Sequence, residues 1–240
     1  MAKRCALAVL WLIAILIVGA GAVRADAPVR VLQNGHEARF PDWMAFHLVA
    51  EADQSIEGVT LYYRERKGTV TSRILPEFTP GKRVEATYAR PLERGEVPPG
   101  TVMEYYWRLE LADGTRHDTD PQTFTYDDDR FAWQHVRAGN LTVYYYGDEG
   151  ALARELLGQA RSTLARLQTE IGITPSEPIG IYVYNSVEDM AAALSPRSEG
   201  YDDLTVTLGV AVSNDTLLLL GDHRGVQQTI SHELSHIVVG

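Results

Sequence analysis

The chain has 240 residues, 45% of them hydrophobic and 22% charged, which is typical of a globular protein with one large or two small domains. Acidic residues outnumber basic residues by 32 to 22, so the formal charge is −10, and such a surface repels the phosphate backbone of nucleic acids. The only cysteine, Cys5, precedes an N-terminal apolar run, which excludes disulfides, a thiol nucleophile and thiolate metal ligands from the rest of the chain.

The N-terminus has the features of an export signal. Lys3 and Arg4 precede an uncharged apolar run over residues 6–23, and Ala25 and Ala27 offer sites for signal peptidase. The run is also just long enough to span a bilayer, so residues 1–25 are predicted to be either a cleaved signal peptide or a membrane anchor. In both cases the positive end stays inside. The rest of the chain is expected outside the cytoplasm, secreted or held at the membrane through this segment alone.

Residues 28–129 carry a β-strand pattern. Stretches such as 59–64 and 103–111 alternate apolar and polar side chains, and turn-prone segments such as 52–55 and 79–83 separate the runs. About seven strands without a helical stretch predict a two-sheet antiparallel β-sandwich. The pattern resembles immunoglobulin-like or fibronectin type III modules.

The pattern changes near residue 130, and residues 131–240 are predicted to form a second, α+β domain. Apolar residues three or four apart predict a helix over 147–172, with Asp148 as its N-cap and Gly172 as its C-terminal stop. The other elements predicted here are strands over 140–146, 179–186, 204–212 and 215–220, a short helix over 187–194, and a terminal helix from about residue 224.

The terminal helix contains the sequence HELSH. Residues four apart project from one face of a helix, so His232 and His236 can present two imidazoles to one metal ion. Glu233 lies about 100° round the helix from His232, well placed to hold a water molecule beside the metal. In this HExxH arrangement Zn²⁺ acidifies the water and polarises the scissile carbonyl, while the glutamate moves the proton to the leaving amine. The sequence therefore predicts His232 and His236 as zinc ligands and Glu233 as the catalytic base.

The apolar residues of the terminal helix fall on another face than the histidines. They form a stripe expected to face the core: Val226, Ile230, Leu234, Ile237 and Val238. The histidines lie away from this stripe and are poor candidates for packed core residues. Two alternatives stay open, namely idle surface histidines and a purely structural zinc site.

The order strand, long helix, strands and motif helix, together with SHELSHIVVG, resembles the upper half of gluzincin zinc metallopeptidases and the bacterial peptidase MA-like family. The resemblance covers about residues 131–240, and its specific motif is His232, Glu233 and His236. It implies an incomplete zincin-like upper subdomain that hydrolyses peptide or protein substrates with zinc. The strand before the motif helix, within 214–222, is expected to form a sheet edge to which an extended peptide could add.

A catalytic zinc takes three protein ligands, and in gluzincins the third is a glutamate well downstream of the second histidine. Only residues 237–240 follow His236 here, and Val239 stands where the metzincin pattern has glycine. Asp202 and Asp222 are minor candidates for the missing ligand, and His223 is predicted to be a loop or cap residue. We therefore expect an incomplete metallopeptidase with little activity by itself.

The predicted domains and the HELSH motif leave two classes of function open. The first is an exported zinc metallopeptidase, or part of one. The second is a non-catalytic envelope protein, with a β-sandwich binding module and a degenerate peptidase-like domain as scaffold. A serine hydrolase is disfavoured because the chain has no G-x-S-x-G motif.

Overall fold

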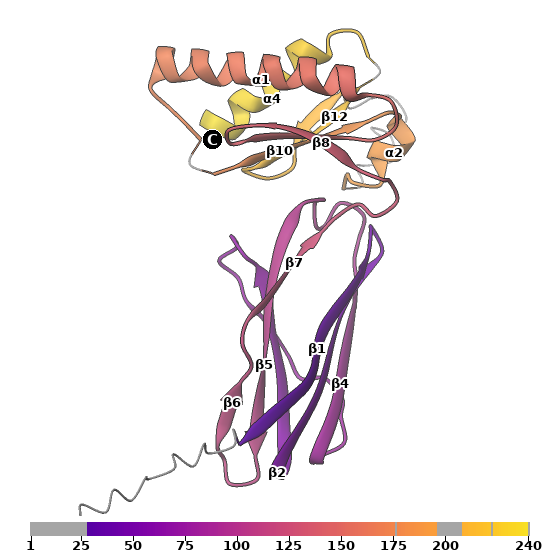
Figure 1. The fold of residues 1–240 in the computed structure, drawn as a ribbon, viewed down its shortest axis with the longest axis vertical. Helices are drawn as coiled ribbons and strands as arrows, with labels where there is room; N and C mark the ends of the chain where they lie inside the picture. Colours follow the sequence, from indigo (N-terminus) through magenta and orange to yellow (C-terminus); the bar gives the residue numbers. More distant parts are fainter. Residues whose placement is uncertain (1–27, 176, 196–207, 222, 240) are drawn as a thin grey trace, which may run out of the picture.

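The computed structural model describes residues 28–175, 177–195, 208–221 and 223–239. The predicted leader, residues 1–25, and the candidate ligands Asp202 and Asp222 lie outside the described residues. Within these ranges no helix has both the length and the apolar character needed to cross a membrane. The described chain is mostly β-structure, arranged as two hydrogen-bonded sheets with helices on one of them (Figure 1).

The first sheet is curled and antiparallel throughout. Its seven strands are β1 (Val29–Arg39), β2 (Trp43–Glu65), β3 (Ser72–Ile74), β4 (Gly81–Pro91), β5 (Thr101–Leu111), β6 (Arg116–Asp118) and β7 (Gln122–Tyr126). The predictions of about seven antiparallel strands and no helix over residues 28–129 are therefore confirmed. The alternation in 103–111 is confirmed as well, because Tyr105, Trp107 and Leu109 are buried between half-buried polar neighbours.

Strand β2 joins what the sequence predicted as two separate sheets. Its first part, residues 43–52, pairs with β1 and β4, and its second part, residues 56–65, pairs with β3 and β5. The predicted turn over 52–55 is wrong, because the backbone runs through this segment as strand with shifts of register beside it. Such irregularities bend a strand without ending it. The strands predicted for two sheets are thus hydrogen-bonded through β2 into one curled sheet, which is consistent with a β-sandwich.

The second sheet has mixed topology. Its strands are β8 (Gln134–Ala138), β9 (Leu141–Tyr145), β10 (Ile179–Tyr184), β11 (Gly209–Ala211) and β12 (Thr216–Leu220). The spatial order is β11-β12-β10-β9-β8, with β12, β10 and β9 parallel and both outer strands antiparallel to their neighbours. The sequence did not predict β8, whose only branched apolar residue, Val136, is just partly buried.

The described helices are α1 (Gly150–Ile171), α2 (Val187–Ala191) and α4 (Val226–Val239). Helix α1 provides the crossover that the parallel strands β9 and β10 need. Gly172 ends it with φ +74° and an N–H bond to the Gln168 carbonyl, as predicted. The N-cap is Glu149 and not Asp148, because a turn over residues 147–149 delays the first helical residue.

Both faces of the second sheet are covered. On one face, side chains of β9, β10 and β12 pack with α1 and α4; they include Val143, Ile181, Val183, Leu217, Leu219, Leu156, Ile230 and Leu234. On the other face, alternate residues join the core of the first sheet: Tyr182, Tyr184, Leu218 and Leu220. Figure 1 shows the same arrangement, with α1 and α4 on the side of the sheet turned away from β1–β7.

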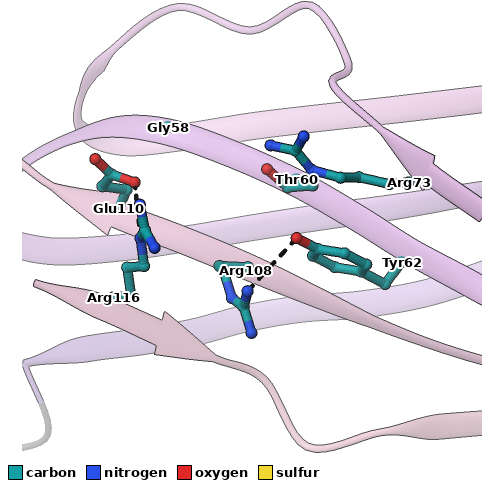
Figure 2. A pocket seen from close by; sticks show the side chains of 7 residues that line it. All are labelled: Gly58, Thr60, Tyr62, Arg73, Arg108, Glu110 and Arg116. Carbon is teal, nitrogen blue, oxygen red and sulfur yellow. Dashed lines mark hydrogen bonds and ion pairs between the residues drawn. The ribbon is translucent and has the colours of Figure 1, made fainter.

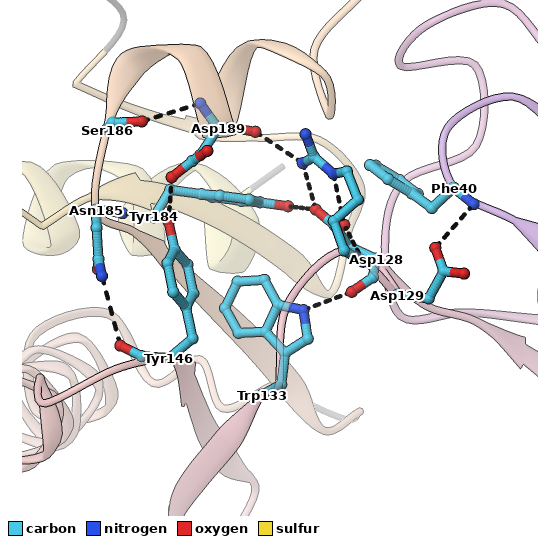
Figure 3. A network of polar contacts seen from close by, with 10 residues as sticks. Phe40, Asp128, Asp129, Trp133, Tyr146, Tyr184, Asn185, Ser186 and Asp189 are labelled. Atoms are coloured by element: carbon cyan, nitrogen blue, oxygen red, sulfur yellow. Dashed lines mark hydrogen bonds and ion pairs between the residues drawn. The ribbon is translucent and has the colours of Figure 1, made fainter.

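A buried carboxylate joins the two sheets at the segment between β7 and β8 (Figure 3). Asp128 is fully buried and accepts hydrogen bonds from Arg130 Nε (2.8 Å), Arg130 Nη2 (2.5 Å) and the Tyr184 hydroxyl (2.9 Å). The Trp133 indole donates to the Asp128 carbonyl at 2.7 Å, and Arg130 also donates to the Asp189 carbonyl at 2.8 Å. A buried charge is tolerated only when it is paired and hydrogen-bonded. Asp128 therefore ties the linking segment to β10 and α2.

A second contact lies near the other end of the parallel strands. Lys67, in the turn after β2, places Nζ 2.6 Å from a carboxylate oxygen of Asp215 and 3.2 Å from one of Glu177. Glu177 precedes β10 and Asp215 precedes β12. The two sheets are thus connected at both ends of β10.

We expect Asp128→Ala to lower the free energy of unfolding by about 3 kcal/mol, because it leaves the Arg130 guanidinium and the buried Tyr184 hydroxyl without their acceptor. The measurement is urea denaturation of the full chain. Asp120→Ala is the matched control, since Asp120 is exposed and should change stability by less than about 0.5 kcal/mol. Equal stability of the two variants would contradict the role given to Asp128.

Candidate metal centre

Helix α4 carries the HELSH motif and docks through its apolar stripe. It begins after Gly225, whose φ of +94° suits a glycine at the turn into the helix. Val226, Ile230 and Leu234 are buried in the core shared with α1 and the second sheet. The predicted terminal helix and the inward orientation of these three residues of its apolar stripe are therefore confirmed, and Ile237 packs partly buried against the same core.

Ser231, the residue before His232, fixes α4 against α1. Its Oγ lies 2.9 Å from Thr163 Oγ1, accepts from Gln159 Nε2 at 2.9 Å and donates to the Gln227 carbonyl at 3.0 Å. Thr163 is buried, so loss of a partner would leave a hydroxyl unsatisfied between the helices. The sequence did not predict this contact, because Ser, Thr and Gln also occur commonly at solvent-exposed positions of helices.

The two histidines project from the exposed face of α4. Their Nε2 atoms lie 3.2 Å apart, and their ring planes meet at 85°. Two nitrogen ligands of a tetrahedral zinc, each at 2.0–2.1 Å from the metal, are separated by roughly 3.3 Å. The pair therefore fits one zinc ion, although the same separation suits a hydrogen bond when one Nε2 carries a proton.

Glu233 and His232 line a groove between α4 and β11. The groove has a volume of about 350 Å³ and is lined by Leu208, Gly209, Gln228, Thr229, His232 and Glu233. Gly209 lets the β11 backbone lie directly against α4. A Cβ at this position would come within 2.5 Å of Thr229 Cγ2, 2.8 Å of Leu219 Cδ2 and 3.4 Å of Glu233 Cγ.

The sheet edge beside the motif is β11, and the expectation that the strand within 214–222 forms this edge is wrong. That strand, β12, pairs with β10 on one side and with β11 on the other. Its five consecutive buried residues are typical of an interior strand. β11 pairs with β12 alone among the described strands, which makes it the outermost strand of the described sheet on this side.

The structure brings His232, Glu233 and His236 to one region, while His223 is held away from the pair. His223 lies in the turn before α4 with Nδ1 2.9 Å from the Arg224 carbonyl, so its prediction as a loop residue is confirmed. Over the described ranges, no group of three or more His, Cys, Asp or Glu side chains is placed to hold a metal ion. The roles of His232, Glu233 and His236 in zinc binding and catalysis stay predictions.

No protein-family model and no curated protein matches this sequence. Among solved structures, wild-type OgpA from Akkermansia muciniphila is similar with 12% identity and a TM-score of 0.30, over 43% of this chain and 30% of that one. The carbohydrate-binding module of the muscle glycogen-targeting subunit of protein phosphatase-1 has 13% identity and a TM-score of 0.32, over 42% and 76% of the two chains. Purple acid phosphatase PPD1 from yellow lupin has 8% identity and a TM-score of 0.32, over 62% and 28%. The chain thus spans less than a third of the length of OgpA, and likeness at this level carries no argument about function.

We expect Gly209→Ala to lower the free energy of unfolding by about 1–3 kcal/mol, because the new methyl group overpacks the contact between β11 and α4. Thermal or urea unfolding measures this. Gly158→Ala is the control. Gly158 lies inside α1 with open space around its Cα, so the alanine should stabilise the helix by up to about 1 kcal/mol. Unchanged stability of Gly209→Ala would mean that β11 does not lie against α4 as described.

Proposed function

We propose that the chain is an exported zinc metallopeptidase, or part of one, of the gluzincin type and the peptidase MA-like family. The observation that carries the proposal is the 3.2 Å separation of the His232 and His236 Nε2 atoms, with Glu233 lining the adjoining groove. Idle surface histidines need no such convergence. Residues 131–240 would form the zincin-like domain under this proposal, and residues 28–129 an immunoglobulin- or fibronectin-like module.

The chemistry proposed is hydrolysis of a peptide bond. Zinc, when bound, supplies a Lewis acid that polarises the scissile carbonyl and lowers the pKa of water. His232 and His236 are the residues that would hold it. Glu233 takes the proton of the attacking water and delivers it to the departing amine, which is general base and then general acid catalysis by one carboxylate.

An extended peptide or protein segment is the substrate that the groove favours. β11 is the outermost described strand on this side of the sheet, and main-chain hydrogen bonding of a peptide to a sheet edge gives affinity that depends little on sequence. Glu233 and His232 line the same groove, so a peptide along β11 would pass beside them. The net charge of −10 argues against nucleic acid as a partner. Any contact with a membrane would be made through residues 1–25.

A catalytic zinc takes a third protein ligand, which the described residues do not contribute. The proposal therefore needs that ligand from another part of the polypeptide. The competing function, a non-catalytic envelope protein with a degenerate peptidase-like domain, needs neither zinc nor hydrolysis, so the two experiments below separate them.

We expect the full chain to bind one zinc ion, and His232→Ala to weaken binding at least about tenfold, since even changes behind a metal ligand cost 10–100-fold. Isothermal titration calorimetry of metal-free protein measures this. His223→Ala is the matched control, because it removes an imidazole of the same region that does not converge on the pair. Equal zinc binding by wild type and His232→Ala would contradict the proposed site.

We expect Glu233→Gln to lower zinc-dependent peptide hydrolysis by about 10²–10⁴-fold while leaving zinc affinity unchanged, because it removes the base and keeps both ligands. A quenched fluorogenic peptide library at high protein concentration provides the assay, since turnover by the 240-residue chain alone is expected to be slow. Glu170→Gln on α1 is the control for loss of a surface carboxylate. Hydrolysis by Glu233→Gln at the rate of this control would rule out Glu233 as the base.

A further inference from the structure

The outer face of the first sheet carries an arginine-rich hollow, separate from the groove at α4. Four strands line it (Figure 2): β2 through Gly58, Thr60 and Tyr62, β3 through Arg73, β5 through Arg108 and Glu110, and β6 through Arg116. Strand register places these residues in adjacent rows, because Tyr62 pairs with Arg73, Thr60 with Arg108 and Gly58 with Glu110. The hollow has a volume of about 100 Å³.

Gly58 and Thr60 form its floor. A Cβ at Gly58 would lie 3.1 Å from Glu110 Cβ, so a larger residue would fill the space that the glycine leaves. Thr60 is 9% exposed, and its hydroxyl makes no hydrogen bond with any residue in the described part of the chain. This hydroxyl is therefore available to a ligand in the hollow.

Two arginines of the wall are held in place by carboxylates. Arg108 donates to Asp118 through Nε and Nη2, both at 2.7 Å, and its guanidinium carbon lies 5.2 Å from the centre of the Tyr62 ring. Arg116 donates to Glu110 through Nε at 3.0 Å, which leaves its two terminal nitrogens without a partner among the described residues. The donors of Arg116 are thus oriented before any ligand arrives, which lowers the entropic cost of binding.

Arg73 completes the cluster. It is exposed, and Figure 2 shows its side chain extending over Thr60. Its guanidinium forms no hydrogen bond or ion pair with a residue that the structure describes. Three guanidinium groups here face two carboxylates, Glu110 and Asp118, so the hollow is locally positive on a protein whose net charge is −10.

We propose that this hollow binds a tetrahedral oxyanion, the sulfate or phosphate group of a small ligand. Guanidinium groups match such anions through paired N–H donors, and a hydroxyl adds a further donor. The donors come from three strands, from Arg73 on β3, Thr60 on β2 and Arg116 on β6. A tetrahedral anion can accept from all three, whereas a planar carboxylate offers two oxygens in one plane. The site does not depend on zinc or on peptide hydrolysis.

The test uses sodium sulfate and sodium phosphate as separate probes of the full chain, at ionic strength held constant with sodium chloride. Nitrogen-15 NMR follows the Arg Nε–H groups and the backbone amide of Thr60. We expect saturable shifts at Arg73, Arg116 and Thr60. Arg73→Gln should weaken binding about tenfold or more, the usual effect of removing a hydrogen bond to a charged group. The stronger of the two probes identifies the anion class.

Arg154→Gln on α1 is the matched control, because it removes the same charge from an exposed position on the other sheet. Thr60→Val keeps the volume of the floor and removes its hydroxyl, so it should weaken binding severalfold. Unfolding midpoints without added anion check that each variant is folded. Absence of saturable shifts, equal weakening by Arg73→Gln and Arg154→Gln, or sodium acetate binding as tightly as sulfate would overturn the proposal.

Discussion

Strands β10 and β12 are apolar on both faces, and the rest of the molecule is arranged around the need to cover them. An apolar sheet face that stays in contact with water gives no stabilisation from burial. Each face of this sheet therefore requires a layer that covers it. Helices α1 and α4 cover one face, and the core of the first sheet covers the other. The position of the motif helix is therefore a consequence of sheet packing. His232 and His236 point outward because Val226, Ile230 and Leu234 must point inward.

Patterns that burial imposes on a single element were predictable from the sequence. The period of two over 103–111, the helical spacing in α1 and the apolar stripe of α4 each reflect one buried face, and all three occur as expected. The role of Gly172 as the C-terminal stop of α1 was also predictable, because a left-handed residue at the end of a helix favours glycine. The shared face of the two histidines follows from their spacing of four residues on a helix.

Features that depend on a distant partner were not predictable. Residues 52–55 have the composition of a turn, yet β4 and β5 supply strand partners on either side of them. The edge position of β11 depends on how β12 is shared between neighbours. Asp128 lies in an acidic run, which suggests a solvated linker. Its burial is tolerated only because Arg130 and Tyr184 donate hydrogen bonds to its carboxylate in the folded protein. The floor made by Gly58 and Thr60 likewise exists only once β5 lies beside β2.

The two connections between the sheets act at opposite ends of β10. Asp128 holds its carboxyl end through Tyr184, and Lys67 holds the chain before its amino end through Glu177, roughly 20 Å away along the strand. Two contacts at opposite ends of one strand restrict rotation of the second sheet relative to the first more than a single contact would. The first sheet consequently separates the start of β1 from the helices, which lie at its opposite end (Figure 1). A partner that binds the start of β1 would therefore determine the distance and the orientation at which the α4 groove lies from it.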